Sequence, residues 1–402
     1  MIELDVKNNI LNKCTTDEKV IVIPDYIYGI RDKAFYNQDS IEEIIMNDEI
    51  EYLGFCVFEN CTNLKKIKLS KKIKALEFNT FKNCYNLEDI NLNYIEEIYK
   101  HSFVSCNKLN NIKFSSKLNI IASNAFIECN NLDKISISAN NKYFEAIEGV
   151  LYSKNLEELV LYPSGKTQSS FIIPPFVKRI RDYQFESNHL LKSITFNENI
   201  TEISEYAFLD CTNLIKVGLS NNITKISPRA FKNCKSLSYI NVPSSVKIIS
   251  DYAFDGCKSL EYVMFNEGLE EIYTNVFKDC IKLDNVYLPV GLKRISSFAF
   301  DSCICLKELL IPKTINYLGE EILKNVSEDL LICYEGNSQE WKNLTKERIT
   351  ITSHQSQNDF HHYGDSVDDI IPTTYKVVKV IPINSKYKVF CKEDSVLLDY
   401  SK

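Results

Sequence analysis

The sequence predicts an α/β or mostly-β solenoid, a right-handed superhelix with a parallel sheet on its concave face and a short β tail. The first observation is a unit that recurs about every 23 residues, written most clearly as FKNCKSLSYINVPSSVKII at 231–249. The second is the alternation of apolar and polar residues at the end of Leu64-x-x-Ile67-x-Leu69, typical of a half-buried strand. One short strand in each repeat would stack into a continuous parallel sheet.

A phenylalanine opens every repeat, and the intervals between these phenylalanines divide the array into two blocks. Five of them stand 22 or 23 residues apart, at Phe35, Phe58, Phe81, Phe103 and Phe126. After a gap of 59 residues, six more follow at intervals of 23, at Phe185, Phe208, Phe231, Phe254, Phe277 and Phe300. Because a coil of this length has little room for a full helix, we expect the phenylalanines to form a second inward column beside the sheet.

The repeats and the segments around them predict five parts of the chain. They are an N-terminal cap (1–29), repeats one to five (30–138), a β-hairpin insert (139–170), repeats six to eleven with a C-terminal cap (171–345), and a polar connector with a short β tail (346–402). We expect Val20–Ile27, a β-rich apolar stretch, to cover the open end of the first repeat. The tail either packs on the open C-terminal end or forms a separate β appendage.

The insert contains two apolar segments, Val150-Leu-Tyr and Leu159-Val-Leu-Tyr, joined through Ser153-Lys-Asn. They have the length and residue types of two strands of a hairpin. We expect this hairpin to be a joint that holds the two blocks together. The alternative is a protruding hairpin that contacts a ligand.

Nine of the 14 cysteines share one position, three residues after the phenylalanine: Cys61, Cys84, Cys106, Cys129, Cys211, Cys234, Cys257, Cys280 and Cys303. Stacked repeats would place them side by side about 4.8 Å apart with parallel Cα–Cβ bonds, which is the wrong geometry for a disulfide. We expect a ladder of free, buried thiols that pack as small apolar groups and donate weakly to turn carbonyls. Cys305 has no second pair at ligand spacing and is expected to be an incidental surface thiol.

Composition and motifs argue against several classes of protein. A net charge of -7 disfavours a general nucleic-acid binder, and no apolar run reaches the roughly 18 residues of a membrane span. The eleven glycines are too scattered for a phosphate-binding loop. There is no G-x-S-x-G motif, and His101 and His189 have no evident Cys or Ser partner. We predict a protein that is not an enzyme and that has no catalytic residues, cofactor or metal.

The tail holds the one candidate for metal-dependent activity, which we keep as an alternative. His354, His361 and His362 stand in the polar connector, with Asp359 or Asp365 nearby. Their spacing matches no recognised zinc or iron pattern. A solvated connector is the simpler interpretation.

The pattern AFxxCxxLxxIxLPxxVxxI resembles the BspA-like leucine-rich repeats, a subclass with a 23-residue period. Repeat starts of that family are matched by ISEYAF at 203–208 and ISDYAF at 249–254. GVLYSKNLEELVLYPSG at 149–165 resembles the hairpin that often interrupts such arrays, and ICYEGNSQEW at 332–341 resembles their closing strand and turn. The resemblance covers about residues 15–345. It implies a leucine-rich repeat fold, an adhesion-like role in binding host or matrix proteins, and a surface or secreted setting.

Two other observations favour the cytoplasm over that setting. The N-terminal segment MIELDVKNN has acids where a signal peptide needs a positive region followed by an apolar stretch. A large number of free thiols also suits a reducing compartment better than an oxidising one. Both settings remain open at this point.

Outward positions of the first three repeats carry charges that alternate from strand to strand. The residues are Glu42 and Glu43, then Lys65, Lys66 and Lys68, then Glu88 and Asp89. Opposite charges on neighbouring strands stabilise a sheet by roughly 0.2–1 kcal/mol a pair. This alternation indicates internal charge balance and argues against a phosphate-binding strip.

Apolar side chains replace these charges in the C-terminal block. The eighth residue after the phenylalanine is Tyr239 and then Tyr262, and the tenth is Met264, Tyr287 and Leu310 in three successive repeats. Because parallel strands align equivalent positions, these five residues should form one contiguous surface, called here the aromatic patch. Clusters of this kind mark interaction surfaces, and Tyr and Met are enriched in interface cores.

We therefore predict a non-catalytic binding module that acts as a monomer. The concave face of repeats eight to eleven would bind a protein partner, or alternatively a glycan, through the aromatic patch. Two other interpretations of the patch are that the C-terminal tail folds back over it, or that it has no role. A structural or self-assembly role through the solenoid ends or the tail is the alternative function.

Overall fold

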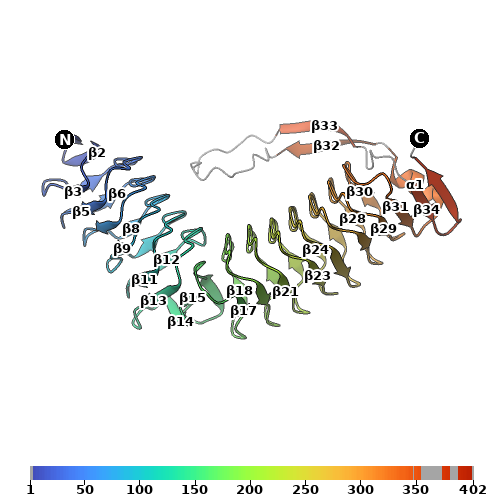
Figure 1. Ribbon diagram of the computed structural model, residues 1–402, viewed down its shortest axis with the longest axis horizontal. Coiled ribbons are helices and arrows are strands. Elements are labelled where there is room, and N and C mark those ends of the chain that lie inside the picture. Colours follow the sequence, from blue (N-terminus) through green and yellow to red (C-terminus); the bar gives the residue numbers. More distant parts are fainter. Residues whose placement is uncertain (1–2, 347, 355–373, 381–387, 401–402) are drawn as a thin grey trace. The chain divides into compact units, whose positions relative to one another are not determined.

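The computed structural model describes residues 3–346, 348–354, 374–380 and 388–400 (Figure 1). Within these residues the chain is a parallel-sheet β-solenoid with few helices, which confirms the predicted fold class. Each turn of the coil lies beside the next, so neighbouring strands in a sheet are about 23 residues apart in sequence.

The chain divides into two compact units, and each is described by itself. Unit 1 comprises residues 1–169 and 176–190, and unit 2 comprises residues 170–175 and 191–402. Repeats one to five lie in unit 1, and the aromatic patch lies in unit 2.

Most repeats contribute two strands, whereas the sequence predicted one. The longer strand has two to four residues and carries the buried apolar residue nine positions after the phenylalanine, such as Ile240. The second has two residues, such as Ile248–Ile249, and stacks into a parallel sheet of its own. Two residues are too few for a period to be recognised, so the sequence pattern gave no sign of the second sheet.

Unit 1 begins with an antiparallel hairpin, β1 (Glu3–Lys7) and β2 (Ile10–Thr15), whose turn places Asn8 and Asn9 at φ of 53° and 58°. Two successive positive φ angles are typical of the two-residue loops that join the strands of a hairpin. The longer strands are β3 (Val20–Val22), β5 (Glu43–Ile45), β7 (Lys66–Lys68), β9 (Asp89–Ile90), β11 (Asn111–Phe114) and β13 (Lys134–Ile137). The short strands are β4 (Gly29–Ile30), β6 (Tyr52–Leu53), β8 (Ala75–Leu76), β10 (Glu97–Ile98), β12 (Ile120–Ile121) and β18 (Arg179–Ile180).

The N-terminal cap has two parts. The stretch from Val20 lies on the first repeat, because β3 pairs in parallel with β5. The hairpin of β1 and β2, which the sequence did not indicate, joins the sheet of short strands, because β2 pairs in parallel with β4. The insert forms β14 (Phe144–Ile147), β15 (Val150–Ser153) and β16 (Glu158–Leu161).

Unit 2 contains the longest sheet among the described residues, ordered β23-β25-β27-β29-β31-β34-β35. The longer strands of unit 2 are β17 (Ser170–Ile172), β19 (Ser193–Thr195), β21 (Lys216–Gly218), β23 (Tyr239–Val242), β25 (Tyr262–Phe265), β27 (Asn285–Tyr287), β29 (Glu308–Ile311) and β31 (Leu331–Tyr334). The short strands are β20 (Glu202–Ile203), β22 (Lys225–Ile226), β24 (Ile248–Ile249), β26 (Glu271–Ile272), β28 (Arg294–Ile295) and β30 (Tyr317–Leu318).

The C-terminal end of this sheet is closed by the tail. β34 (Lys388–Cys391) pairs in parallel with β31, and β35 (Val396–Asp399) then pairs antiparallel with β34. The helix α1 (Ser338–Leu344) begins with a capping box built from Asn337 and Glu340, and its Trp341 is fully buried. A separate antiparallel pair, β32 (Arg348–His354) and β33 (Thr374–Val380), shows that the tail combines the two arrangements expected for it.

The phenylalanines form a stacked, fully buried column. In unit 2 the ring centroids of Phe231 and Phe254 lie 5.3 Å apart, and those of Phe254 and Phe277 lie 5.5 Å apart. The turn around each phenylalanine except Phe126 bends through two left-handed residues, such as Arg229 and Asn233 at φ of 55° and 59°. This turn takes the place of a helix, as its length predicted.

The cysteine ladder is confirmed, and all of its members are free and buried. Cys257 Sγ donates to the carbonyl oxygen of Phe231, in the preceding repeat, at 3.1 Å. Seven others make the same bond at 3.0–3.2 Å: Cys61, Cys84, Cys106, Cys129, Cys234, Cys280 and Cys303. Burial raises the pKa of Cys61 and of Cys129 to about 12, so these thiols stay protonated at neutral pH.

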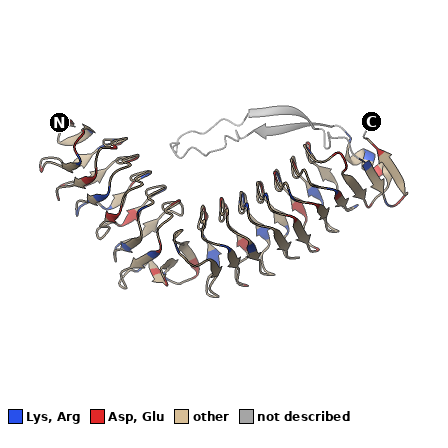
Figure 2. Cartoon of the chain, in the orientation of Figure 1, with Lys and Arg blue, Asp and Glu red and all other residues tan. Residues whose placement is uncertain are grey.

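Figure 2 shows basic and acidic residues on neighbouring turns of unit 1. Glu42 accepts from Lys65 Nζ on the next repeat and from Lys19 Nζ on the preceding turn, each at 2.7 Å. Hydrogen bonds from these two ammonium groups lower the pKa of Glu42 to about 2. The expected pairing of opposite charges is therefore present at Glu42, which also pairs with Lys19, a residue that the sequence analysis did not name.

We expect Phe254→Ala to destabilise unit 2 by about 3–5 kcal/mol, because it removes a ring stacked on both sides and leaves a cavity. Urea unfolding followed by the fluorescence of Trp341, the only tryptophan, measures the change. Ile304→Ala, at a side chain that is 56% exposed, is the control and should change stability by less than about 0.5 kcal/mol. Equal effects of the two substitutions would contradict the buried column.

We expect one cysteine of 14 to react rapidly with a thiol reagent in the native protein, and all 14 in urea. Cys305 is the exposed thiol, whereas the other 13 are buried. Cys305→Ser should remove the rapid phase. Two or more rapidly reacting thiols in that variant would show that the ladder is open to solvent.

Candidate binding surface

The aromatic patch lies on the outward face of the long sheet in unit 2. Strand register places Tyr239 opposite Tyr262, and Tyr287 opposite Leu310. Tyr262 lies opposite Asn285, so Met264, two residues further along β25, lies in the same column as Tyr287. The five predicted residues are thus brought together in two adjacent columns.

Burial alternates along these strands as a half-buried sheet requires. Ile240 and Val286 are fully buried, which sends their neighbours outward. Four side chains of the aromatic patch are 43–46% exposed: Tyr239, Tyr262, Met264 and Tyr287. Leu310 is half-buried. The described part of the tail extends the sheet beyond β31 and leaves these four side chains exposed.

One further exposed apolar side chain lies on the same face. Leu331 on β31 is 37% exposed and lies opposite Glu308, so Asn285 and Glu308 separate it from Tyr262 in that column. It was missed because no phenylalanine opens the turn that carries β31. The signal that could have found it is the closing ICYEG segment, because Leu331 stands directly before its buried Ile332.

A shallow depression of about 460 Å³ lies between Tyr262 and Tyr287. It is called here the tyrosine depression. Its rim contains two ion pairs, Lys282–Glu261 at 3.2 Å and Lys307–Asp284 at 3.1 Å, together with the exposed thiol of Cys305. The depression thus combines aromatic surfaces with charged groups, a mixture suited to holding one polar side chain in a fixed orientation.

The charge around Tyr287 is mainly negative. Its hydroxyl donates to Glu308 Oε2 at 3.2 Å. The Glu308 carboxylate is the main cause of the raised pKa of Tyr287, with smaller contributions from burial, Tyr262 and Asp284. Tyr287 therefore stays a neutral hydrogen-bond donor at physiological pH, beside carboxylates.

The family model of the BspA type leucine rich repeat region matches residues 28–157, 162–283 and 224–333, in six copies. The chain belongs to this family. BspA-type repeats are typical of binding scaffolds without catalytic activity. A comparison with curated proteins found no match.

Solved structures show the same fold at low sequence identity. A leucine-rich repeat protein from Eubacterium ventriosum has a TM-score of 0.61 at 22% identity, over 81% of this chain and 93% of that one. One from Bacteroides ovatus has a TM-score of 0.55 at 20% identity, over 85% and 95%. The pneumococcal vaccine antigen PcpA has a TM-score of 0.53 at 22% identity, over 81% and 76%.

The insert of this BspA-type protein is built into the repeat stack of unit 1. β15 and β16 pair antiparallel, and β14, which the sequence did not indicate, adds a third strand. β16 also pairs in parallel with β18, so it takes the place of a short repeat strand. β14 was missed because Glu145 and Ala146, two residue types that are depleted in strands, stand in the middle of its four residues.

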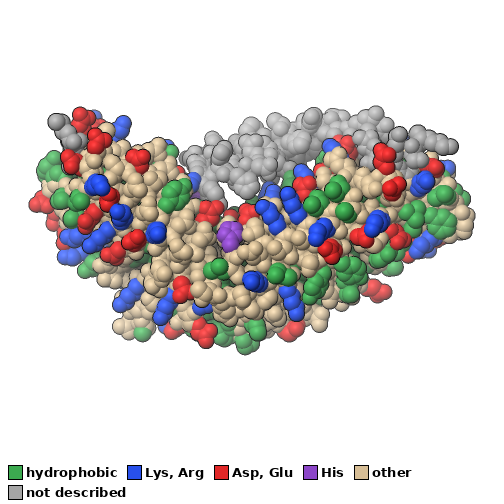
Figure 3. Space-filling model, in the orientation of Figure 1, with side chains coloured by type: hydrophobic (Ala, Val, Ile, Leu, Met, Phe, Trp, Pro, Cys, Tyr) green, Lys and Arg blue, Asp and Glu red, His purple; other side chains and the backbone are tan. Residues whose placement is uncertain are grey.

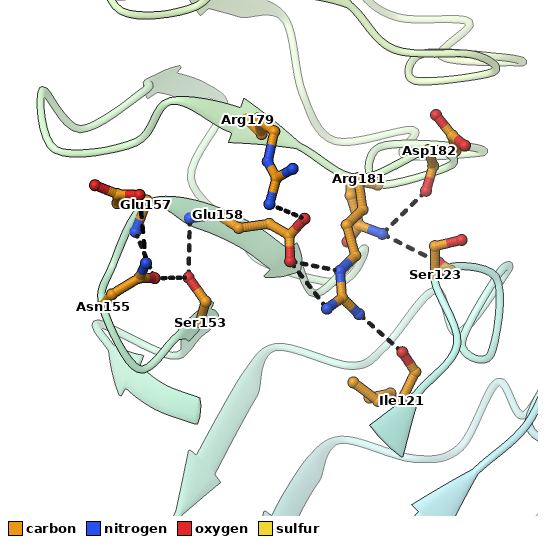
Figure 4. Close-up of polar contacts among 10 residues, drawn as sticks. Ile121, Ser123, Ser153, Asn155, Glu157, Glu158, Arg179, Arg181 and Asp182 are labelled. Atoms are coloured by element: carbon orange, nitrogen blue, oxygen red, sulfur yellow. Dashed lines mark hydrogen bonds and ion pairs between the residues drawn. The ribbon is translucent and has the colours of Figure 1, made fainter. Parts of the chain in front are cut away.

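Arg181 connects the insert to the preceding repeat (Figure 4). Its Nε donates to Glu158 Oε2 at 2.9 Å, and its Nη1 donates to the carbonyl oxygen of Ile121 at 2.8 Å. Gln184 makes a second connection, because its Nε2 donates to the carbonyl oxygen of Ser123 at 3.0 Å. These contacts hold the insert within the repeat stack of unit 1. Its role as a joint between the two blocks stays a prediction.

The described residues contain no group of three or more His, Cys, Asp or Glu side chains that could hold a metal ion. Of the tail candidates, His354 ends β32, while Asp359, His361, His362 and Asp365 lie outside the described residues. No helix within the described ranges is long and apolar enough to cross a membrane.

On the face turned to the viewer in Figure 3, apolar and charged side chains are interspersed.

We expect Arg181→Leu to destabilise the insert by about 1–3 kcal/mol, because it leaves Glu158 and the Ile121 carbonyl without their donor. Hydrogen exchange of peptides covering β16 and β18 measures the effect as lost protection. Arg179→Leu is the matched control, because that side chain is 76% exposed and lies 3.5 Å from Glu158. Equal loss of protection in both variants would contradict the role of Arg181.

Proposed function

We propose that this chain is a non-catalytic binding module that holds a protein partner on the aromatic patch. One observation carries the proposal: four exposed apolar side chains stand in register on three consecutive strands, β23, β25 and β27. An isolated exposed tyrosine needs no explanation, but a contiguous set on a flat face marks an interaction surface. Family membership favours an adhesion-like form of this binding.

The rigidity of the sheet supports the proposal. Of the strands that carry the aromatic patch, β25, β27 and β29 are paired on both sides and β23 is paired with β25. Their inward side chains are packed in the solenoid core. A surface that is already ordered loses little conformational entropy when a partner binds. Tyrosine side chains then supply large contact areas, with a hydroxyl that can find a partner at the interface.

The end of the sheet argues against assembly by continued stacking of copies. The last strand, β35, runs antiparallel to β34 and closes the C-terminal edge. Another copy would need a parallel edge there to continue the ladder that joins β29, β31 and β34. We therefore favour binding over self-assembly.

We expect Tyr262→Ala combined with Tyr287→Ala to weaken partner binding by about 2 kcal/mol or more, roughly 30-fold, as for interface anchors. The wild type and the double variant are used to capture proteins from the source cell and its surroundings. The affinity for a captured partner is then measured by calorimetry.

Tyr85→Ala combined with Tyr143→Ala is the control. These tyrosines lie in unit 1 and are 43% and 53% exposed, so the change in side chains is matched. Both double variants should unfold at the temperature of the wild type. A partner that binds the Tyr262/Tyr287 variant with wild-type affinity would refute the proposal.

A further inference from the structure

A carboxylate without an ion pair lies beside the tyrosine depression, bonded to the hydroxyl of Tyr287. Lys282 pairs with Glu261 and Lys307 pairs with Asp284, whereas Glu308 makes no ion pair with any described residue. Glu308 holds the Tyr287 hydroxyl through Oε2, and its Oε1 accepts only a long contact from Cys333 Sγ at 3.6 Å. An incoming cation would therefore find a free acceptor oxygen beside an aromatic ring.

Asp284, on the rim of the depression, is already neutralised. Its Oδ2 accepts from Lys307 Nζ at 3.2 Å, and its Oδ1 lies 3.1 Å from the same nitrogen and is shielded from solvent. Glu308 is therefore the carboxylate beside Tyr287 that keeps an acceptor oxygen for an incoming donor.

This chain already places guanidinium groups against tyrosines of neighbouring repeats. Arg294 lies 4.1 Å above the ring centroid of Tyr317, one repeat further on. Arg229 lies between Tyr206 and Tyr252, at 5.4 and 5.0 Å from their centroids. The repeat spacing therefore fits a guanidinium stacked on a tyrosine of the adjacent turn.

We propose that the tyrosine depression binds an arginine side chain of the partner protein. The guanidinium stacks on Tyr262 or Tyr287 and donates to Glu308. This inference rests on the proposed function, and it adds the chemistry of the partner. A planar guanidinium can stack on a ring and form directed bonds to carboxylates at the same time. A lysine ammonium is a compact, strongly hydrated charge without the planar face, so it fits the site less well.

The test uses the full chain and two small probes, N-acetyl-L-arginine methylamide and N-acetyl-L-lysine methylamide. Saturation-transfer NMR at low ionic strength measures the affinity of each. We expect the arginine probe to bind about fivefold or more tightly than the lysine probe. Only the guanidinium can stack on a tyrosine ring and donate two parallel hydrogen bonds to a carboxylate. Raising the salt concentration should weaken its binding.

Two variants examine the assigned contacts. Glu308→Gln removes the unpaired charge but keeps the shape, and Tyr287→Leu removes the ring but keeps an apolar side chain. Each should weaken the arginine probe by about fivefold, the order of one charge-assisted bond or one cation–π contact. Glu198→Gln, at an exposed glutamate in unit 2 outside the depression, makes the same charge change and should have no effect.

The outcomes separate this inference from the proposed function. Equal binding of the two probes, or wild-type binding by Glu308→Gln, overturns the arginine assignment even if partner capture still depends on Tyr262 and Tyr287. Arginine binding as expected, with partner capture indifferent to both tyrosines, supports the assignment and refutes the proposed function. Binding of methyl β-cellobioside that depends on Tyr262 and Tyr287, with neither amino-acid probe bound, overturns both the arginine assignment and the proposed function in favour of a glycan.

Discussion

Stacking of the backbone from one turn to the next is the constraint on which the rest of the structure depends. Phe231 N donates to the carbonyl oxygen of Ala253 at 2.8 Å, and Arg229 N and Asn233 N donate to the next turn in the same way at 2.9 and 2.7 Å. These bonds fix the register of each repeat on its neighbour. Equivalent positions must then form columns, whatever side chains they carry. The phenylalanine column, the thiol ladder and the aromatic patch all follow from this one repeated contact.

Columns also explain where charge is tolerated. The residue after each phenylalanine is Lys232 and then Asp255 in successive repeats, and their side chains pair at 3.1 Å although both are almost buried. Desolvation raises the pKa of Asp255, and the nearby Lys232 opposes that rise. A buried pair contributes little net stability, but a shift of one turn against the next would leave both charges unpaired. The pair therefore acts mainly on register, in addition to the backbone bonds between turns.

Structural features that recur in every repeat could be predicted from the period of the sequence, whereas features that occur once could not. The repeat length predicted the longer sheet, the turns without a helix and the buried thiols, because each recurs many times. The five residues of the aromatic patch could be placed together for the same reason. The two-residue strands, β14 in the insert and Leu331 beyond the last phenylalanine were missed, because each is too short or occurs once. Arg181 shows the same limit: its contact with Ile121 joins residues 60 apart, a separation that no repeat predicts.

The thiol ladder has a consequence for how the cysteine content should be interpreted. Oxidation of a cysteine requires an accessible thiolate, and formation of a disulfide requires Cβ atoms that point toward each other. Thirteen of the 14 thiols are buried, and eight of them donate to a backbone carbonyl of the preceding repeat. Such a fold is indifferent to the redox potential of its surroundings. The abundance of free cysteine, which at first suggested a reducing compartment, is therefore equally compatible with an oxidising one.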